Sequence, residues 1–297
     1  MTQLADGAPG RGTASAGWDR STSATSFNIL TELVADGSVI VLSGAGLSTE
    51  SGIPDYRGPT GRTRRAEPMT YQTFVGGRAA RQRYWARSHV GWRHVAQARP
   101  NAGHRAVAEL ERRGLVAGII TQNVDGLHTA AGARQVIELH GRLDRVLCLS
   151  CGGRTDRDQL DQRLSAANPG WAQEAARPAV INPDGDAVLD DALVEQFQVV
   201  NCGACDGLLK PDVIFFGENV PRTRVDDCYA LVERAGALVV LGSSLTVMSG
   251  FRFVRQAAKL DIPVVIVNQG ETRGDELATA TLDAPLGPTL SQLLACV

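Results

Sequence analysis

The sequence predicts an α/β protein built around a buried parallel sheet. Four short apolar runs carry this prediction, at residues 39–42, 115–121, 237–241 and 262–267. None of them alternates apolar and polar residues, which favours strands that are covered on both faces. Each run ends in small or polar residues, and ligands of open α/β sheets bind at the carboxyl ends of the strands. The sequence therefore predicts a ligand site at that edge of the sheet.

Helices are predicted between these runs and before them, at residues 26–35, 79–92 and 101–113. Residues 1–26 are rich in Gly, Ala, Ser and Thr and hold few large apolar residues, which is typical of a disordered tail. The segment from about 148 to 210 shows no strong periodicity. We therefore expect a small insert there that is held together by something other than a large core.

The composition is that of a globular protein of 297 residues, with 43% hydrophobic and 21% charged residues. A net charge of −2 gives no electrostatic case for binding nucleic acid. No run approaches the ~18–20 apolar residues of a membrane helix, and the N-terminus lacks the apolar stretch of a secretory signal. Only Lys210 and Lys259 are lysines among the 30 basic residues, which indicates a high-GC coding bias and favours a bacterial cytoplasm.

A glycine turn, Gly44-Ala45-Gly46, follows the first apolar run. Glycine lets backbone N–H groups approach a pyrophosphate closely. The third glycine of the dehydrogenase fingerprint would stand at Thr49, so the turn alone leaves dinucleotide binding and an ordinary tight turn open. The polar segment that follows contains Asp55 and Arg57, and Arg57 offers a planar fork to a phosphate. A salt bridge within the loop is the alternative for Asp55.

Three polar residues, Gln122, Asn123 and Asp125, close the second apolar run. Such side chains are costly to bury without partners. At the carboxyl end of a strand they are suited to hydrogen-bond ribose hydroxyls and a carboxamide. The sequence therefore predicts a nucleoside site at this strand end.

His140 is the histidine that the sequence favours as a general base. A neutral imidazole near pH 7 takes a proton from a sugar hydroxyl. A glycine follows His140, and the cysteine-containing region comes directly after it. We interpret His104 and His128 as structural, and His89 and His94 as packing or surface residues.

The sequence contains two C-x-x-C pairs, Cys148/Cys151 and Cys202/Cys205. Without a signal peptide, metal binding is more plausible than disulfides. Four thiolates satisfy Zn²⁺ and leave no open position, which makes such a site structural. Metal binding would also supply folding free energy to the insert. A redox pair is the alternative, and Cys228 and Cys296 are interpreted as buried or incidental.

Together these segments resemble the sirtuins, the family of NAD-dependent protein deacylases. The matching segments occur in family order over about residues 30–290, at 44–57, 121–128, 138–141, the two cysteine pairs, 210–218, 242–244 and Asn268. Within the family the chain is most similar to the class II branch, which includes the mitochondrial lipoamidase and ADP-ribosyltransferase type. The segments that carry this similarity are 81–92, 140–148 and 183–186.

The resemblance implies a Rossmann-type parallel sheet domain with a smaller zinc-binding and helical module inserted. The sheet domain would comprise residues 27–145 and 211–297, and the module residues 146–210. A helical insert at about 59–100 would begin with a flexible cofactor loop at 59–73. NAD, consumed as a co-substrate, and the acyl-lysine of a protein would meet between the two parts. One structural Zn²⁺ would bind the four paired cysteines.

The resemblance also implies a role for each matching residue. His140 would be the general base and Asn123 a second catalytic residue. The residues that would bind NAD are Gly44, Ala45, Gly46, Ser48, Asp55, Tyr56, Arg57, Gln122, Asn123, Asp125, Gly242, Ser243, Ser244, Asn268, Gln269, Gly270 and Leu286. The acyl-lysine peptide would bind as an added strand to Val213, Phe215, Gly217, Glu218, Leu245 and Val247.

In the implied reaction, the acyl oxygen attacks C1′ of the nicotinamide ribose, and nicotinamide leaves. His140 then activates a ribose hydroxyl, which attacks the resulting imidate. Water resolves the adduct to free lysine and O-acyl-ADP-ribose.

Two other functions stay open at this point. Mono-ADP-ribosyl transfer to protein uses the same NAD site. A zinc-dependent binding module would bind NAD without releasing nicotinamide, but intact His140, Asn123 and Asp125 argue against it. Tyr84-x-x-Arg87 has the spacing of a pair that binds acidic acyl groups in one branch, although its distance from Pro100-Asn101 does not match. We expect a roomy pocket for acetyl and longer acyl groups, acyl-lysine proteins as partners, and a monomer.

Overall fold

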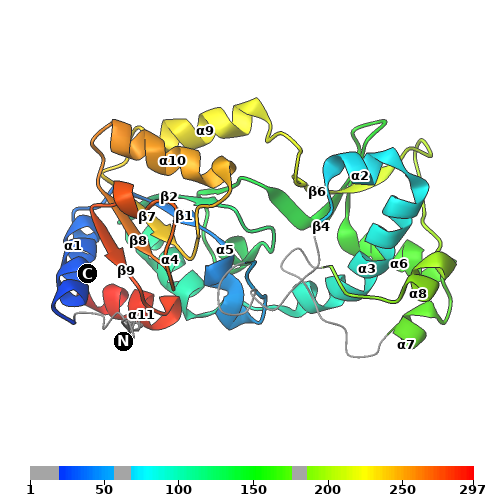
Figure 1. Cartoon of the computed structure of the whole chain (residues 1–297), viewed down its shortest axis with the longest axis horizontal. Coiled ribbons are helices and arrows are strands. Elements are labelled where there is room, and N and C mark those ends of the chain that lie inside the picture. Colours follow the sequence, from blue (N-terminus) through cyan, green and yellow to red (C-terminus); the bar gives the residue numbers. More distant parts are fainter. Residues whose placement is uncertain (1–19, 57–67, 176–185) are drawn as a thin grey trace, which may run out of the picture.

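The computed structural model describes residues 20–56, 68–175 and 186–297, and its centre is a six-stranded parallel sheet (Figure 1). The strands, in the sheet order β3-β2-β1-β7-β8-β9, are β3 (Val136–Glu138), β2 (Val116–Thr121), β1 (Val39–Ser43), β7 (Ala237–Leu241), β8 (Val264–Val267) and β9 (Ala280–Leu282). The predicted parallel sheet is confirmed, and the four apolar runs are β1, β2, β7 and β8. The edge strands β3 and β9 were not predicted.

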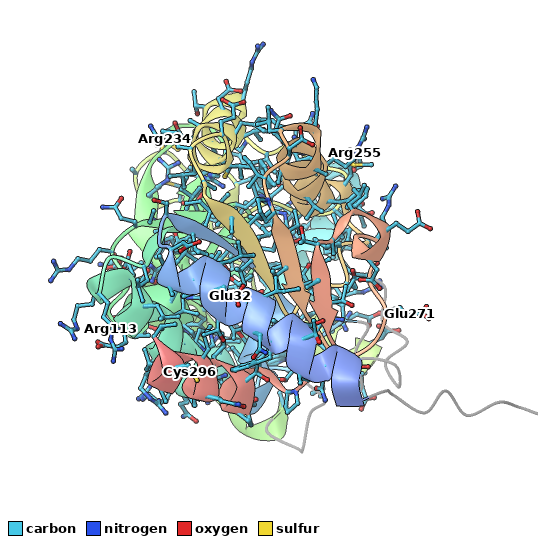
Figure 2. All side chains as sticks on the ribbon, turned by 90° about the vertical axis from the view of Figure 1, so that its left-hand side faces the viewer. Glu32, Arg113, Arg234, Arg255, Glu271 and Cys296 are labelled. Carbon is cyan, nitrogen blue, oxygen red and sulfur yellow. The ribbon has the colours of Figure 1, made fainter. Side chains whose placement is uncertain are left out.

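Helices cover both faces of the sheet, as Figures 1 and 2 show. Those on one face are α1 (Arg20–Ala35), α4 (Ala102–Arg112) and α11 (Leu286–Cys296), and those on the other are α9 (Arg222–Val232) and α10 (Met248–Lys259). In β1, Val39 and Val41 pack in the first of these two cores, and Ile40 and Leu42 in the second. Burial on both faces explains why the strands are continuous apolar runs. None of the helices described is long and apolar enough to cross a membrane.

Helix α1 begins at Arg20, earlier than the predicted start at residue 26. The predicted tail was therefore wrong for residues 20–26, and residues 1–19 lie outside the described residues. Ser and Thr at 21–25 weaken the helical signal of the sequence, because they favour caps and turns over helix interiors. Gly37 follows the end of the helix with a φ of 80°, and its N–H donates to Val34 O (3.1 Å).

A small module lies beside the sheet domain, on the right in Figure 1. We define it as residues 68–97 and 141–213. Its antiparallel sheet has the order β5-β4-β6, with β4 (Gly141–Cys148), β5 (Arg154–Asp156) and β6 (Leu209–Val213). Its helices are α2 (Tyr71–Gly76), α3 (Arg78–Gln97), α6 (Arg157–Ala167), α7 (Trp171–Ala175) and α8 (Asp191–Gln196). The predicted domain boundary at 146 falls inside β4, and of the predicted cofactor loop residues 59–67 lie outside the described part.

The small module has an apolar core of its own, contrary to the prediction. Trp85 and Trp92 of α3 lie in one buried cluster with Leu160 of α6 and with Phe197. The buried guanidinium of Arg157 lies 5.5 Å from the centroid of each of the two tryptophan rings, which stabilises the buried charge. Five of the eighteen buried residues of this core come from α3, which is distant in sequence from the cysteine region. When residues 148–210 are considered alone, their apolar residues therefore show no periodicity that would predict a core.

Two buried histidines lie against each other beneath the carboxyl ends of β1 and β2. They are His104 of α4 and His128 of α5 (Leu127–Ala130), and their ring centroids are 5.1 Å apart. His128 Nε2 lies 2.8 Å from Ser43 Oγ. Burial lowers the pKa of His104 to about 4 and that of His128 to about 3. Both rings are neutral at pH 7, which agrees with the structural roles predicted for them.

Acidification is expected to destabilise the protein through this pair. As the pH falls below 6.5 the unfolded state binds protons that the folded state excludes, so the free energy of unfolding falls with it. For the two rings together this loss is about 5 kcal/mol between pH 7 and pH 4.5. The His104 ring nitrogens have no hydrogen-bond partner among the described residues, so His104→Leu removes an ionisable group without removing a side-chain hydrogen bond. Urea unfolding of this variant should show a shallower pH dependence than the wild type, and equal slopes would contradict the explanation.

Candidate active site

One large cavity, with a volume of about 660 Å³, lies between the carboxyl edge of the sheet and the small module. Sites for small molecules span about 300–1,000 Å³. The cavity is lined by every predicted catalytic, NAD-binding and substrate residue that the structure describes, namely Gly44, Ala45, Gly46, Ser48, Asp55, Tyr56, Gln122, Asn123, Asp125, His140, Val213, Phe215, Gly217, Glu218, Gly242, Ser243, Ser244, Leu245, Val247, Asn268, Gln269, Gly270 and Leu286. Arg57 lies outside the described residues. Segments far apart in the chain thus converge on one site.

The glycine turn begins the 3-10 helix η1 (Ala45–Ser51) and packs against the loop after β7. The amides of Gly44 and Gly46 each donate to a backbone oxygen of residues 241–242, both at 2.9 Å. A Cβ on Gly44 would lie 2.7 Å from Ser243 Cβ, and one on Gly46 2.9 Å from Gly242 Cα. The glycines are therefore needed because the loops after β1 and β7 meet there, at the switch point of the sheet. The amides of these two residues are engaged within the protein, and the close approach of a pyrophosphate to this turn stays a prediction.

Helix η1 is fixed to two further helices by hydrogen bonds. Asn101, the N-cap of α4, donates from Nδ2 to Leu47 O (2.7 Å). The N–H of Gly287, in the first turn of α11, donates to Glu50 Oε1 (2.9 Å). A carboxylate at a helix N-terminus is also favoured by the helix dipole. The segment that forms this wall of the cavity is therefore held in place from both sides.

A chain of hydrogen bonds joins η1 to the polar end of β2. Asn123 Nδ2 donates to Gly44 O (3.0 Å) and to Ser48 Oγ (3.1 Å), and Ser48 Oγ donates to Asp125 Oδ2 (2.6 Å). Asp125 Oδ1 accepts the N–H of Leu127 (2.9 Å). These polar groups have partners within the protein, which offsets the cost of burying them. Their orientation is therefore set before a ligand arrives.

The carboxyl group of Asp125 is electrostatically unusual. Burial raises its pKa, and hydrogen bonds from Ser48 and from the Leu127 amide, together with Arg142, oppose the rise. Beside it, Gln122 Nε2 donates to Ser243 Oγ (2.8 Å), which links the ends of β2 and β7. A buried carboxyl next to amide and hydroxyl groups is suited to bind a ligand carboxamide.

His140 lies between β3 and β4 with both ring nitrogens engaged. Nδ1 is 2.9 Å from Gln122 O, and Nε2 is 2.8 Å from Ser249 Oγ. A carbonyl oxygen only accepts, so Nδ1 carries the proton of the neutral ring and Nε2 presents its lone pair. Gly141 makes this placement possible, because its φ is 82° and a Cβ there would lie 2.0 Å from Asp212 O.

The surroundings of His140 keep its ring neutral. Burial lowers the pKa of His140, and Arg224 and Arg252 lower it further, while the hydrogen bond to Gln122 O opposes them. A lowered pKa leaves the imidazole without a positive charge at pH 7. This is the protonation state that a general base requires.

The predicted substrate residues of 213–218 start directly beside the base. The N–H of Ile214 donates to His140 O (2.8 Å). Lys210 Nζ lies 2.9 Å from Glu218 Oε2, and the same carboxylate oxygen accepts the N–H of Phe215 (2.9 Å). The Lys210 side chain is 3% exposed, so this ion pair is shielded from water. The ion pair between Lys210 and Glu218 restricts the turn after β6 to one conformation.

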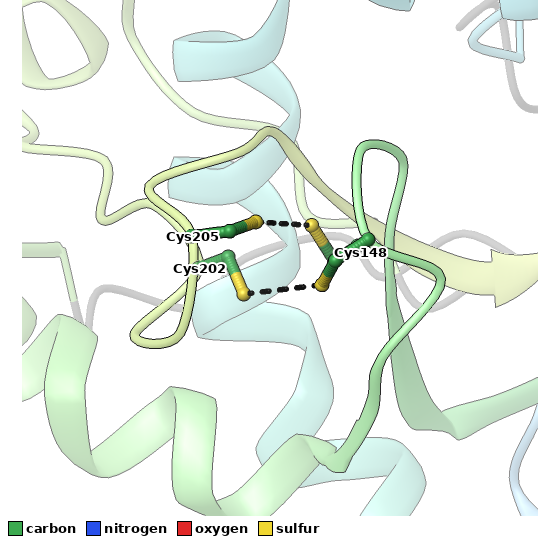
Figure 3. Close-up of side chains that lie close together, drawn as sticks. Cys148, Cys202 and Cys205 are labelled. Atoms are coloured by element: carbon green, nitrogen blue, oxygen red, sulfur yellow. Dashed lines mark hydrogen bonds between the residues drawn. The ribbon is translucent and has the colours of Figure 1, made fainter.

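The four paired cysteines form one cluster at the edge of the small module. Their sulfur atoms lie within 4.8 Å of one another. Cys148 Sγ is 3.5 Å from Cys205 Sγ, and Cys151 Sγ is 4.0 Å from Cys202 Sγ; Figure 3 shows the sulfur of Cys148 turned toward that of Cys205. Four sulfurs bound tetrahedrally to Zn²⁺ at about 2.3 Å would be about 3.8 Å apart. The cluster therefore fits a closed zinc site, as predicted.

Comparison with known proteins places this arrangement in a family. A family model described as Sir2 family matches residues 44–249. The chain belongs to the Sir2 family. The matched region contains the glycine turn, the polar end of β2, His140 and the cysteine cluster, so the predicted resemblance to the sirtuins is confirmed. Membership of the class II branch stays a prediction.

Curated relatives cover most of this Sir2-family chain. "NAD-dependent protein deacetylase 1" of Streptomyces coelicolor is 62% identical over 255 residues, which is 86% of this chain and 84% of the relative. "NAD-dependent protein deacetylase 1" of Mycobacterium avium is 52% identical over 266 residues, 89% of this chain and 93% of the relative.

Solved structures of the Sir2 family share the fold. One described as "Sir2-p53 peptide-NAD+" has a TM-score of 0.71 and 29% identity, with coverage of 91% of this chain and 97% of the other. Another, described as "Structure of Sir2Tm bound to a propionylated peptide", has a TM-score of 0.68 and 27% identity at the same coverage. The predicted Rossmann-type architecture with an inserted module is confirmed.

Several cavity residues were missed by the sequence analysis. Met69, Leu143 and Phe216 line the cavity, and of these Met69 and Leu143 are isolated apolar residues in their segments. Phe216 is 40% exposed, and a large exposed aromatic residue beside a matching motif is a usable signal. Ser249 contacts His140, but nothing in its own sequence position indicates this.

Proposed function

We propose that this protein is an NAD-dependent protein-lysine deacylase with His140 as its general base. The observation that carries the proposal is the neutral, part-buried imidazole in the cavity that the predicted NAD-binding and substrate residues share. Both curated relatives are named NAD-dependent protein deacetylases. The products would be nicotinamide, O-acyl-ADP-ribose and a protein with a free lysine.

In this proposal, different residues accept the proton, orient the substrates and line the NAD site. Nε2 of His140 takes the proton of a ribose hydroxyl. Asn123 and Asp125, fixed through Ser48, orient the ribose and the carboxamide. The loops after β1, β7 and β8 line the remainder of the NAD site. The peptide lies as an added strand between segments 213–218 and 245–247, where main-chain groups supply affinity.

The proposed Zn²⁺ is structural and takes no part in the reaction. None of the four cluster cysteines lines the cavity in the described part of the chain. Four thiolates also leave no coordination position for water or substrate. The metal would join residues 148–151 to residues 202–205 and so close the small module.

We propose acetyl and longer neutral acyl groups as substrates. The cavity residues that belong to the core of the small module or pack against it are all apolar or aromatic, namely Met69, Tyr84, Val124, Leu143, Val213 and Phe215. Among the described lining residues, the charged ones are Glu50, Asp55, Asp125, Glu218 and Glu271, and none is Arg or Lys. Such a lining repels a carboxylate.

The predicted Tyr84-x-x-Arg87 pair does not come together in the cavity. Tyr84 lines it, but Arg87 does not. Arg87 Nε donates to Ala187 O (2.6 Å) and lies 3.2 Å from Asp186 Oδ1. The arginine is therefore engaged by the small module, which supports the preference for neutral acyl groups.

A panel of acyl-lysine peptides tests both the reaction and the acyl preference. With NAD present, acetyl, propionyl and butyryl peptides should lose their acyl groups, as scored by mass. A succinyl peptide should react at least about 100-fold more slowly than the acetyl peptide, because its carboxylate would be buried without a partner. Faster removal of succinyl than of acetyl would contradict the acyl preference. A gain of ADP-ribose mass on the peptide, without loss of the acyl group, would favour mono-ADP-ribosyl transfer instead.

The partners proposed are acyl-lysine side chains of other proteins. A monomeric state, a cytoplasmic location and the absence of nucleic-acid binding stay predictions from the sequence.

A further inference from the structure

Ser249 makes a contact with His140 that the proposed reaction has not yet used. It lies in the first turn of α10 and lines the cavity. Its Oγ is 2.8 Å from His140 Nε2. The first turn of α10 has no side-chain cap from its N-cap residue, Val247. The Ser249 hydroxyl is thus directed at the imidazole.

The direction of this hydrogen bond follows from the other side of the ring. Gln122 O can only accept, so His140 Nδ1 holds the proton and Nε2 accepts from the Ser249 hydroxyl. The Nε2 lone pair that accepts the Ser249 hydroxyl in the resting site is therefore the one that takes a proton from the substrate. Once Nε2 is protonated, the ring has no lone pair left, and the same Oγ can only accept from it.

The backbone leaves little freedom at this contact. A Cβ on Gly250 would lie 2.5 Å from Gln122 Oε1. The start of α10 therefore packs directly on Gln122, the residue whose carbonyl holds the other ring nitrogen. His140 is fixed at both nitrogens by segments that themselves touch each other.

We propose that Ser249 is a positioning residue for His140 and a hydrogen-bond acceptor for its protonated ring. In the resting site the Ser249 hydroxyl donates to Nε2 of the neutral ring, whose proton on Nδ1 is directed at Gln122 O. When the ribose hydroxyl binds, its proton moves to Nε2 and its oxygen keeps the electron pair for attack. Ser249 keeps its own proton and turns its O–H bond away. The inference rests on the proposed deacylase function.

Loss of this hydroxyl should slow only the step that protonates His140. Hydrogen bonds to a charged group are about twice as strong as neutral ones, so the imidazolium loses more in Ser249→Ala than the neutral ring does. We expect deacylation turnover to fall about 10- to 100-fold. Exchange of labelled nicotinamide into NAD, which reports the step before the base acts, should stay at the wild-type rate.

Two further variants separate this role from a structural one. Ser249→Thr keeps the hydroxyl and should restore most of the turnover. Ser291→Ala removes another helical serine, whose hydroxyl donates to Gly287 O (2.8 Å) in the same helix, and should leave both rates unchanged. Equal turnover of Ser249→Ala and wild type would overturn the inference. A parallel loss of exchange and deacylation would overturn it too, because it indicates a damaged site.

A titration without NAD gives a readout that does not depend on activity. NMR of the His140 imidazole should show a lower pKa in Ser249→Ala than in the wild type, because the charged ring loses an acceptor. Arg224 of α9 and Arg252 of α10 are the charged groups that lower the pKa of this ring, and both the wild type and Ser249→Ala retain them. An unchanged or raised pKa would overturn the inference. If wild-type protein removed no acyl group with NAD, the proposed function itself would fail, which is a different outcome.

Discussion

Replacing His140 with alanine is expected to lower deacylation turnover about 10²- to 10⁴-fold, the usual contribution of a general base. Burial lowers the pKa of His140, so the wild-type ring is neutral and its Nε2 carries the lone pair that takes a proton. Alanine offers no acceptor at this position. The steps before proton transfer use other residues, so NAD should still bind and nicotinamide exchange should continue. Mass spectrometry of the acyl peptide measures the turnover.

His94→Ala is the matched control for this experiment. Its ring is exposed on α3, does not line the cavity, and has Nε2 3.0 Å from Gly52 O at the surface, so loss of this exposed contact should leave turnover close to the wild type. If His140→Ala also kept wild-type turnover, the assignment of the base would be wrong. If it lost NAD binding together with turnover, His140 would be a cofactor contact and not a base.

Replacing Cys202 with serine is expected to release the zinc and to unfold part of the small module. The four sulfurs lie within 4.8 Å of one another, and a serine hydroxyl does not replace a thiolate ligand. Structural zinc contributes on the order of 10 kcal/mol to folding in small domains. This is comparable to the whole stability of a typical protein, about 5–15 kcal/mol. The metal content per chain and the Tm from circular dichroism should both fall.

The loss should reach the active site through two strands. β4 and β6 pair with each other, and they carry Gly141 and Val213 next to the base and the substrate wall. Cys296→Ser is the matched control, because this exposed cysteine of α11 lies outside the cluster. It should keep its zinc, Tm and activity. A Cys202→Ser protein with one zinc per chain and an unchanged Tm would contradict a closed four-cysteine site.

The parts of the fold that the sequence predicts are those whose signal is local. β1, β2, β7 and β8 are buried on both faces, so each is a continuous apolar run that ends near its predicted boundary. β3 and β9 have three residues each and lie at the sheet edges, which is too short for a pattern. The core of the small module is also hidden in the sequence, because Trp85 and Trp92 reach it from a helix before β2.

The site follows the same rule. Strand ends converge at one edge of a parallel sheet, so the meeting of the glycine turn, Asn123 and His140 in one cavity could be predicted from order and motif. The purpose of Gly44 and Gly46 could not, because it depends on how closely the loop after β7 approaches them. The contact of Ser249 with His140 depends on where α10 begins relative to β4. Such distances are tertiary and leave no local pattern.

The stoichiometry of products tests the central claim most directly. Wild-type protein is incubated with NAD and an acetyl-lysine peptide, and three products are quantified by chromatography and mass spectrometry. A deacylase that consumes NAD yields equal amounts of nicotinamide, deacetylated peptide and O-acetyl-ADP-ribose, and none without NAD. Deacetylated peptide formed with free acetate and without nicotinamide would contradict the account, since the acyl group would then leave by direct hydrolysis.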